Sequence, residues 1–114
     1  MECIFCKIIK KEVPADIEYE DQKIVAFRDI KPRAPIHILI VPKEHRIKSA
    51  ADISEEDLLL VGKLILVAKK IAEKKGLIKD GYRLTFNVGP NAGAVILDHI
   101  HLHLLGGGKL GPEA

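Results

Sequence analysis

The stretch Asp98-His99-Ile100-His101-Leu102-His103-Leu104-Leu105-Gly106-Gly107 places three of the chain's five histidines at alternate positions. Residues i, i+2 and i+4 of a β-strand point to one face of the sheet, so a strand here would line one surface with His99, His101 and His103. The apolar residues between the histidines would then enter the core on the opposite face. The pattern therefore predicts a half-buried strand that presents a row of imidazoles.

A row of three imidazoles constrains its own chemistry. Three adjacent cations would repel one another and are costly to remove from water, so we expect the row to be largely neutral at neutral pH. Such a row suits an anion, and a phosphate group is a fitting ligand. A metal suits it too, because catalytic zinc often has three nitrogen ligands and an open position. The spacing alone leaves both a phosphate site and a three-histidine zinc site open.

The clearest helix signal is Ser54-Glu55-Glu56-Asp57, where a serine can cap free backbone amides and acidic side chains favour the positive helix end. Apolar residues then recur at helical spacing and predict a stripe buried against a core. The predicted stripe consists of Val61, Leu64, Ile65, Ala68, Ile71 and Ala72. Gly76 is expected to end this helix, and Ile4–Glu12 is expected to form a second, short one.

Five short segments that are rich in β-branched or aromatic residues and bounded by turn formers are predicted strands. They are Ile17–Tyr19, Ile24–Phe27, His37–Val41, Tyr82–Asn87 and His99–Leu105. The polar connection Glu20–Lys23 is short enough to make the first two an antiparallel hairpin. We therefore expect one α+β domain over residues 1–114, with an antiparallel sheet of about five strands and one long and one short helix on one side of it.

Composition and charge argue against several classes of function. The net charge of +2 comes from interspersed lysines and glutamates, so no continuous basic surface for nucleic acid is expected. The wholly apolar runs, such as Leu58–Val61, are far too short to cross a membrane, and the acidic start does not resemble a signal peptide. Cys3 and Cys6 are too close together for an ordinary disulfide, which favours the reducing cytoplasm and leaves a metal or redox pair open.

The histidine row and the Leu105-Gly106-Gly107 that follows it resemble the signature of the histidine triad hydrolases, in the manner of their phosphoramidase branch. Blocks elsewhere resemble the same family, and together they cover nearly the whole chain. These blocks are Ile4–Ile9, Tyr19–Asp21, Ala26–Ile30, Ala34–His37, Val41–His45 and Gly81–Leu84. The resemblance implies the fold of that family and a homodimer whose subunits join their sheets across a two-fold axis.

The resemblance also implies a catalytic role for His101. As the central histidine, it would displace an amine or another leaving group from the α-phosphorus of a purine nucleotide and form a nucleotidyl-histidine, which water hydrolyses. His103 would contact the α-phosphate and stabilise the charge that grows in the transition state, and Asn87 would reach the same region. From the residues alone, Asn87 is nearly as well explained as a turn residue.

Other matched positions would hold the nucleoside. Asp29 corresponds to a carboxylate that accepts hydrogen bonds from the ribose hydroxyls. Phe5, Phe27 and Ile30 correspond to apolar positions that sandwich the base, although each is equally well explained as core. His37 matches a family histidine to which we assign no role.

Cys3, Cys6, His45 and His99 match a two-cysteine, two-histidine zinc site that the resemblance implies for many bacterial members of the family. A closed tetrahedral site of this kind would be structural, because it would tie the amino terminus to the histidine strand and perform no chemistry. The alternative is that the cysteines are ordinary buried thiols. With zinc bound, His99 would be a ligand and would leave catalysis to the other two histidines of the row.

The chain departs from the family between Gly93 and His99. There the family has a glycine-rich turn, a Gln, and a Ser or Thr whose hydroxyl helps to protonate the departing amine. The segment Ala94-Val95-Ile96-Leu97-Asp98 has neither and is one residue longer, so a β-bulge or a reshaped phosphate pocket is expected. We expect slow turnover or an altered substrate, with Asp98 as a substitute acid only if its pKa is raised.

The leading expectation is an enzyme that hydrolyses purine nucleoside phosphoramidates to the nucleotide and a free amine. One alternative is an enzyme that cleaves dinucleoside polyphosphates with the same nucleophile. The other, which follows from the abnormal loop, is a regulatory module that binds nucleotides with little turnover.

Overall fold

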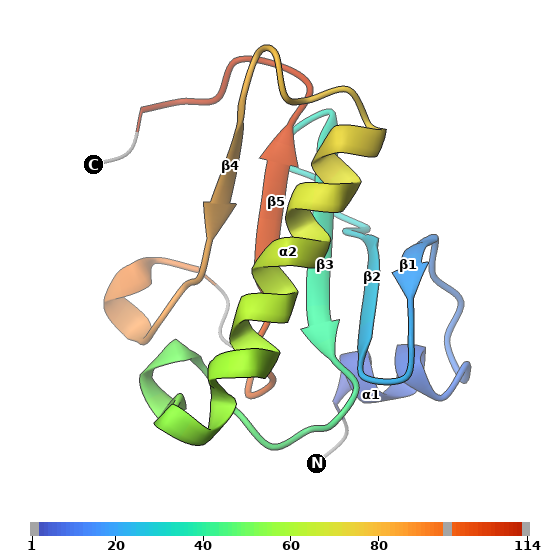
Figure 1. Cartoon of the computed structure of the whole chain (residues 1–114), viewed down its shortest axis with the longest axis vertical. Coiled ribbons are helices and arrows are strands. Elements are labelled where there is room, and N and C mark those ends of the chain that lie inside the picture. The colour runs from blue at the N-terminus through green and yellow to red at the C-terminus, as the bar shows by residue number, and fades with distance from the viewer. Residues whose placement is uncertain (1–2, 95–96, 113–114) are drawn as a thin grey trace.

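Five antiparallel strands form a single sheet in the order β1-β2-β3-β5-β4 in this computed structural model, which describes residues 3–94 and 97–112 (Figure 1). The strands are β1 (Ile17–Glu20), β2 (Ile24–Arg28), β3 (Ile36–Pro42), β4 (Tyr82–Thr85) and β5 (Leu102–Gly106). Two α-helices accompany them, α1 (Ile4–Ile9) and α2 (Leu58–Lys74). Within the described residues, the predicted α+β class, the five strands and the pair of helices are confirmed.

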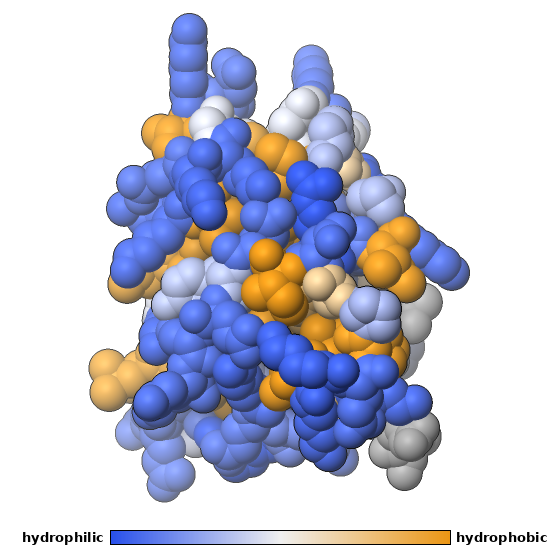
Figure 2. Space-filling model, turned by 90° about the vertical axis from the view of Figure 1, so that its right-hand side faces the viewer, coloured by the Kyte–Doolittle hydropathy of each residue, from blue (hydrophilic) through white to orange (hydrophobic). Residues whose placement is uncertain are grey.

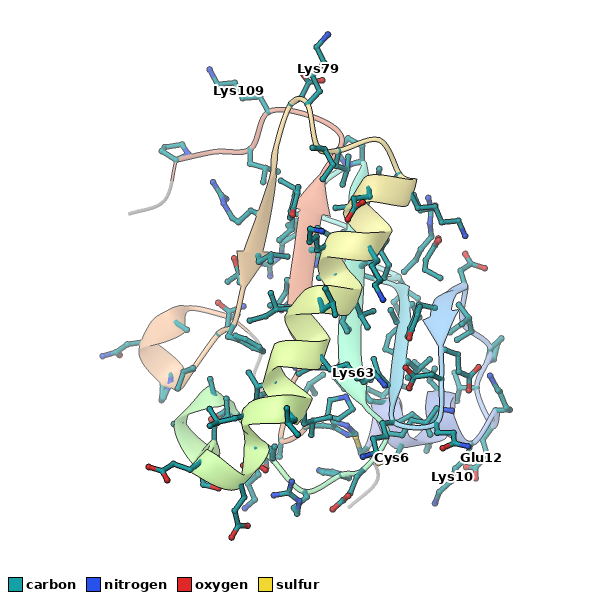
Figure 3. The ribbon with its side chains drawn as sticks, viewed as in Figure 1. Cys6, Lys10, Glu12, Lys63, Lys79 and Lys109 are labelled. Atoms are coloured by element: carbon teal, nitrogen blue, oxygen red, sulfur yellow. The ribbon has the colours of Figure 1, made fainter. Side chains whose placement is uncertain are left out.

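The first two strands form the predicted antiparallel hairpin. Asp21 closes its connection, because its carboxylate accepts hydrogen bonds from the backbone amides of Lys23 and Ile24, both at 2.8 Å. An acidic side chain that satisfies nearby amides in this way stabilises a tight turn. Lys63 of α2 forms an ion pair with the same carboxylate at 2.9 Å, so the hairpin is tied to the long helix (Figure 3).

The long helix lies across one face of the sheet (Figure 1). It begins directly after a capping box in which Ser54 and Asp57 each bind the other's backbone amide. Its buried residues are Leu64, Val67, Ala68, Ile71 and Ala72. The predicted stripe is wrong at Ile65, which is 44% exposed. Each residue turns the helix by about 100°, so Ile65 falls beside the stripe, and Val67 falls within it.

The short helix lies on the opposite face, so the prediction of both helices on one side is wrong. Phe5 and Ile8 of α1 pack there against a second core. This second core is formed by Val25, Phe27, Leu39 and Val41. β2 and β3 are consequently buried on both faces, and uninterrupted apolar runs such as Ile38–Val41 are typical of such strands. The helix ends at Ile9 rather than at Glu12, because Lys11 adopts a left-handed backbone conformation with φ of 64°.

The strand within the histidine pattern begins later than predicted. β5 starts at Leu102 and pairs with β3 on one side and β4 on the other. The residues before it leave the sheet, and the backbone amide of Ile100 donates instead to the carbonyl of Ile47 at 2.9 Å. Of the three histidines, only His103 lies in the strand. The apolar residues that alternate with them are buried as predicted: Ile100, Leu102 and Leu104.

The surface carries a small number of exposed apolar side chains. Viewed from the β1 side, it is mostly hydrophilic, with an apolar area near its centre (Figure 2). Ile30, which follows β2, is 87% exposed, and Leu59 on α2 is 91% exposed. No helix within residues 3–94 and 97–112 combines the length and the apolar character that crossing a membrane requires.

Candidate functional site

A cavity of about 370 Å³ opens on the face of the sheet that carries α1. Its walls come from α1, from the end of β2 and the turn after it, from β3, from the segment after β4, and from the histidine stretch. The structure brings all the predicted nucleotide-binding residues to this cavity: Phe5, Phe27, Asp29, Ile30, Asn87, His101 and His103. Cavities of roughly 300–1,000 Å³ hold small organic ligands.

One end of the cavity is apolar. The rings of Phe5 and Phe27 are each 3% exposed and lie 5.6 Å apart, so they form a floor that is continuous with the second core. Ile30 stands on the rim and is almost fully exposed. A flat ring placed between this floor and Ile30 would gain apolar contact on both of its faces. Asp29 adjoins this end, and one of its carboxylate oxygens accepts a hydrogen bond from the backbone amide of Lys31 at 2.9 Å.

His101 has one ring nitrogen committed and one available. Its Nδ1 lies 2.9 Å from the backbone carbonyl of His99. A carbonyl can only accept, so the proton of the neutral ring resides on Nδ1, and Nε2 keeps its lone pair. The ring of Phe5 packs edge-on against His101 at 5.1 Å between centroids and restricts its orientation. A held, unprotonated nitrogen beside a cavity can act as a nucleophile.

A chain of hydrogen bonds fixes the protons of two further histidines. The backbone amide of Arg33 donates to Nδ1 of His37 at 3.1 Å, so His37 carries its own proton on Nε2. That proton is donated to Nδ1 of His103, 2.9 Å away. His103 therefore carries its proton on Nε2. Nδ2 of Asn87 lies 3.5 Å from that atom, and because both atoms then carry hydrogens, they do not bond to each other. His103 and Asn87 can both offer N–H groups to the same part of the cavity.

The rings of His37 and His103 are neutral at neutral pH. Burial lowers the pKa of His103 to about 4, and the adjacent His101 and His37 rings act in the same direction. Burial also lowers the pKa of His37, against the opposing effect of Asp29, whose carboxylate lies 3.6 Å from its Nε2. A neutral His103 donates a hydrogen bond without placing a desolvated charge in the site. The expected neutrality of the row is thus confirmed for His103.

The place of His37 in this network was missed by the sequence reasoning, which gave it no role. His37 is buried and sits on β3 within the apolar sequence Ile36–Val41. A polar side chain in such a run needs a hydrogen-bond partner once it is buried, and that requirement was the available signal. The identity of the partner could not be read from the sequence, because His103 is 66 positions away.

Cys3, Cys6, His45 and His99 form a separate cluster beside the cavity, with their ligand atoms all within 4.8 Å of one another. Sγ of Cys3 lies 3.4 Å from Nδ1 of His99, and Sγ of Cys6 lies 3.2 Å from Nδ1 of His45 and 3.8 Å from that of His99. In a tetrahedral zinc site, sulfur and nitrogen ligands lie about 3.6 Å apart. Both cysteines are free thiols. The donor set and its spacing therefore fit zinc.

The hydrogen bonds around the cluster also suit a metal. Nε2 of His99 donates to the carbonyl of Pro42 at 2.7 Å, and Nε2 of His45 donates to the carbonyl of Asp98. Each ring thus holds its proton on Nε2 and turns the lone pair of Nδ1 toward the thiols, which is how metal-binding histidines are usually oriented. Cys6 lies at the end of the molecule where α2 begins (Figure 3).

The geometry separates His99 from the other two histidines of the row. His99 is fully buried, and its free ring nitrogen faces the cysteines. Of the row, only His101 and His103 line the cavity, with their ring centroids 5.0 Å apart. The prediction that all three side chains share one surface is wrong, and so is the three-histidine zinc site, because within the described residues His99 groups with Cys3 and Cys6.

The atypical loop is only partly described. Residues 95 and 96, on which the expected bulge falls, lie outside the described residues. Ala94 and Leu97 line the cavity. Asp98 is exposed and does not line it, so the suggestion that its carboxylate replaces the missing acid is wrong. Neither Ala94 nor Leu97 has a side chain that could protonate a leaving group.

Comparison with known proteins agrees with this geometry. A family model described as "Scavenger mRNA decapping enzyme C-term binding" matches residues 2–110. The purine nucleoside phosphoramidase of Escherichia coli K12 is 50% identical over 111 residues, which cover 97% of this chain and 92% of that protein. The 14 kDa zinc-binding protein of Zea mays is 49% identical over 108 residues, which cover 94% of this chain and 83% of that protein.

A solved structure gives the same result for the fold. The HIT family hydrolase of Legionella pneumophila Philadelphia 1 is similar at a TM-score of 0.90 and 47% identity, over 96% of each chain. The likeness in sequence and the likeness in structure both extend over nearly the whole chain. The chain therefore belongs to the histidine triad (HIT) family, and it is a hydrolase of that family.

Proposed function

We propose that the protein hydrolyses purine nucleoside phosphoramidates through a covalent nucleotidyl intermediate on His101. The observation that carries this proposal is the proton arrangement of the cavity. Nε2 of His101 keeps a lone pair, while His103 and Asn87 offer hydrogen-bond donors to the same cavity, with the His101 and His103 ring centroids 5.0 Å apart. A nucleophile beside fixed donors is the arrangement that displacement at a phosphorus atom requires.

The reaction would take place in two steps. Nε2 of His101 attacks the α-phosphorus, the phosphorus–nitrogen bond breaks, and the departing amine takes a proton from solvent. Water then attacks the phosphorus of the nucleotidyl-histidine, which releases the nucleotide and restores the neutral ring. In both steps His103 and Asn87 bind the non-bridging phosphate oxygens, where negative charge increases in the transition state.

The apolar end of the cavity would hold the purine nucleoside. The Phe5–Phe27 floor and Ile30 suit the flat base, and Asp29 suits two adjacent ribose hydroxyls. The E. coli relative, 50% identical, is named a purine nucleoside phosphoramidase, which supports this choice of substrate.

The test is the release of amine from an adenosine 5′-phosphoramidate, followed by fluorescence of the freed amine. We expect turnover by the wild type and none above background by His101→Ala. His101→Gly should recover part of the activity when imidazole is added, because free imidazole can replace the missing nucleophile. Nucleotide binding without amine release would support a regulatory module instead, and preferential cleavage of diadenosine polyphosphates would support the polyphosphate hydrolase.

We further propose that Cys3, Cys6, His45 and His99 hold one structural zinc ion. Bound zinc would fix α1, through its cysteines, to the loop after β3 and to the segment before β5. The maize relative is named a zinc-binding protein. Elemental analysis of protein purified without added metal should give about one zinc per chain, and Cys6→Ser should lose it. Lys10→Gln, a change on the same short segment, should retain it (Figure 3).

The homodimer implied by the family remains a proposal, and the exposed apolar side of α2 supports it. Leu58, Leu59 and Leu66 are large side chains at the surface of this helix, and β4 is an edge strand of the sheet. Sedimentation should give a dimer for the wild type and a monomer for Leu66→Glu. Ile78→Glu, which charges an exposed apolar residue outside α2, should stay dimeric.

Two reduced zinc-binding thiols suit a reducing compartment, so we propose the cytoplasm as the location.

A further inference from the structure

A cation lies at the phosphate end of the main cavity, the one of about 370 Å³ that contains His101, and the proposed reaction gives it no role. This cation is Arg33, an exposed residue of the turn between β2 and β3. It lines the main cavity and also a neighbouring cavity of about 340 Å³. Three other residues line both: His37, Asn87 and His103. Arg33 therefore lies where the two spaces meet, beside the groups that we propose bind the phosphate.

The backbone of this turn is held by the site itself. The backbone amide of Arg33 donates to Nδ1 of His37 at 3.1 Å, and the backbone amide of Asp29 donates to the carbonyl of His37 at 2.9 Å. Both ends of the segment 29–33 are thus fixed to a buried residue of β3. Because the bond from Arg33 uses its main chain, replacing the side chain leaves the hydrogen-bond chain of the histidines intact.

The guanidinium of Arg33 is available to a ligand. Among the described residues, it forms no hydrogen bond or ion pair. The two other cations that line the main cavity differ from it. Arg28 is already paired with Glu18 at 3.2 Å. Lys31 lines the main cavity alone, at the end where its backbone amide binds Asp29. Arg33 therefore combines an unpaired charge with a place beside the phosphate-binding groups.

The charge of Arg33 acts on both histidines of the hydrogen-bond chain. Burial is the main reason that the pKa of His37 and that of His103 are lowered, and the positive charge of Arg33 lowers the pKa of each ring further. A positive charge that opposes protonation of these rings attracts an anion bound beside them. A guanidinium also presents several N–H donors in a planar fork, which fits two oxygens of one phosphate group.

The atypical loop before the histidine row leaves the phosphate short of donors. Ala94 and Leu97 of that loop line the main cavity, and neither side chain can donate a hydrogen bond. His103 and Asn87 are then the neutral donors at the phosphate. Displacement at phosphorus spreads negative charge over the equatorial oxygens, and each of these oxygens can accept more than one hydrogen bond. Two neutral donors thus leave part of this charge without a partner.

We propose that Arg33 is a further catalytic residue, whose guanidinium binds the non-bridging phosphate oxygens together with His103 and Asn87. This inference rests on the proposed phosphoramidase function and adds to its machinery. The covalent steps are unchanged: Nε2 of His101 bonds to phosphorus, the phosphorus–nitrogen bond breaks, and the amine takes a proton from solvent. Arg33 keeps its protons throughout, because a guanidinium does not deprotonate in proteins. It supplies, from the turn after β2, donors that the loop lacks.

The first test measures binding and does not depend on catalysis. AMP and adenosine differ only in the phosphate, so the ratio of their affinities isolates the contacts to it. At about pH 8, where His37 and His103 are neutral with or without the charge of Arg33, we expect Arg33→Gln to lower this ratio about tenfold. Arg33→Lys should retain part of the ratio. Lys31→Gln is the matched comparison, because it removes the same charge two positions away, and its effect should be much smaller at physiological ionic strength.

The second test measures the chemical step. With enzyme in excess over a bound adenosine 5′-phosphoramidate, Arg33→Gln should release the amine about tenfold more slowly than the wild type. Arg33→Ala should regain part of its rate when guanidinium chloride is added at concentrations far below those that unfold proteins, because the free cation can occupy the place of the missing side chain. Lys31→Ala should gain nothing from this addition.

The outcomes separate this proposal from the function on which it rests. An AMP-to-adenosine ratio that is the same in the wild type and Arg33→Gln, or that Lys31→Gln lowers as much, would overturn the phosphate contact of Arg33. If the wild type still hydrolyses the phosphoramidate, the phosphoramidase function would stand. A lowered ratio with an unchanged single-turnover rate would overturn the catalytic role. Failure of the wild type to hydrolyse the substrate would overturn the phosphoramidase function and the catalytic role with it.

Discussion

Replacing His103 by glutamine should make the folded protein less sensitive to acid. Burial, reinforced by the neighbouring His101 and His37 rings, lowers the pKa of His103 to about 4. In an unfolded chain a histidine titrates near pH 6.5. Between these values the unfolded chain binds a proton that the folded protein does not, so acid favours unfolding. The wild type should lose stability as the pH falls below about 6.5, and the loss from this residue should be complete below about pH 4.

The size of the effect follows from the pKa. Each pKa unit corresponds to about 1.4 kcal/mol, so lowering the pKa of His103 from 6.5 to about 4 is linked to about 3 kcal/mol of unfolding free energy. This is an upper value, because the ring keeps some contact with solvent in the cavity, and solvent reduces the penalty for charging it. Glutamine has no proton to gain in this range and retains hydrogen-bonding capacity.

Urea unfolding of both proteins at about pH 7 and about pH 4 measures the difference. The stability of His103→Gln relative to the wild type should improve by up to about 3 kcal/mol on acidification. Both proteins keep the same cysteine and histidine cluster, so loss of any bound zinc at low pH cancels in the comparison. Thr85→Ser, a change at the cross-strand neighbour of His103, should follow the wild type. A stability difference that does not change with pH would refute the buried, neutral His103.

Three further results are expected. His37→Phe removes the hydrogen bond to Nδ1 of His103, so it should lower kcat/KM about tenfold and allow the proton of His103 to move between its two ring nitrogens. Nitrogen NMR spectra would detect this movement, and unchanged spectra would contradict the hydrogen-bond chain. Leu64→Ala should cost about 2–5 kcal/mol in thermal or urea unfolding, whereas the exposed Ile65→Ala should cost far less; equal losses would contradict the helix orientation. Because Ala94–Leu97 supplies no acid, rates should rise steeply as the leaving amine becomes less basic; a flat dependence would indicate an unrecognised proton donor.

Much of the fold was predictable because its signals are local. The hairpin depends on a short polar turn closed by Asp21, and α2 follows a capping box at Ser54, and both act within a few residues. The placement of α1 is different. That α1 covers the other face of the sheet could be inferred only from the apolar runs of β2 and β3, which are typical of strands buried on both faces. This signal is weakened by His37, because a polar residue near the start of β3 is also expected in a strand that is buried on one face only.

In the candidate site, the alternation of residues along the sequence no longer predicts which way each side chain points. Alternation assigns side chains to a common face only while the backbone remains a strand, and here the strand begins at Leu102. Because the amide of Ile100 binds the carbonyl of Ile47 instead of β3, the chain before it is free to turn His99 toward the cysteines. The cavity residues that the family resemblance indicated do come together, but the hydrogen bond between His37 and His103 is a product of tertiary folding alone.

The proposed covalent intermediate offers the decisive observation. An adenosine 5′-phosphoramidate mixed with the wild-type protein and quenched with base within the first turnover should leave one nucleotide attached to the chain, and peptide mapping by mass spectrometry should place it on His101. His103→Gln should carry the same label with slower formation. Complete turnover with no labelled protein at any time, or a label on another residue, would contradict nucleophilic attack by Nε2 of His101.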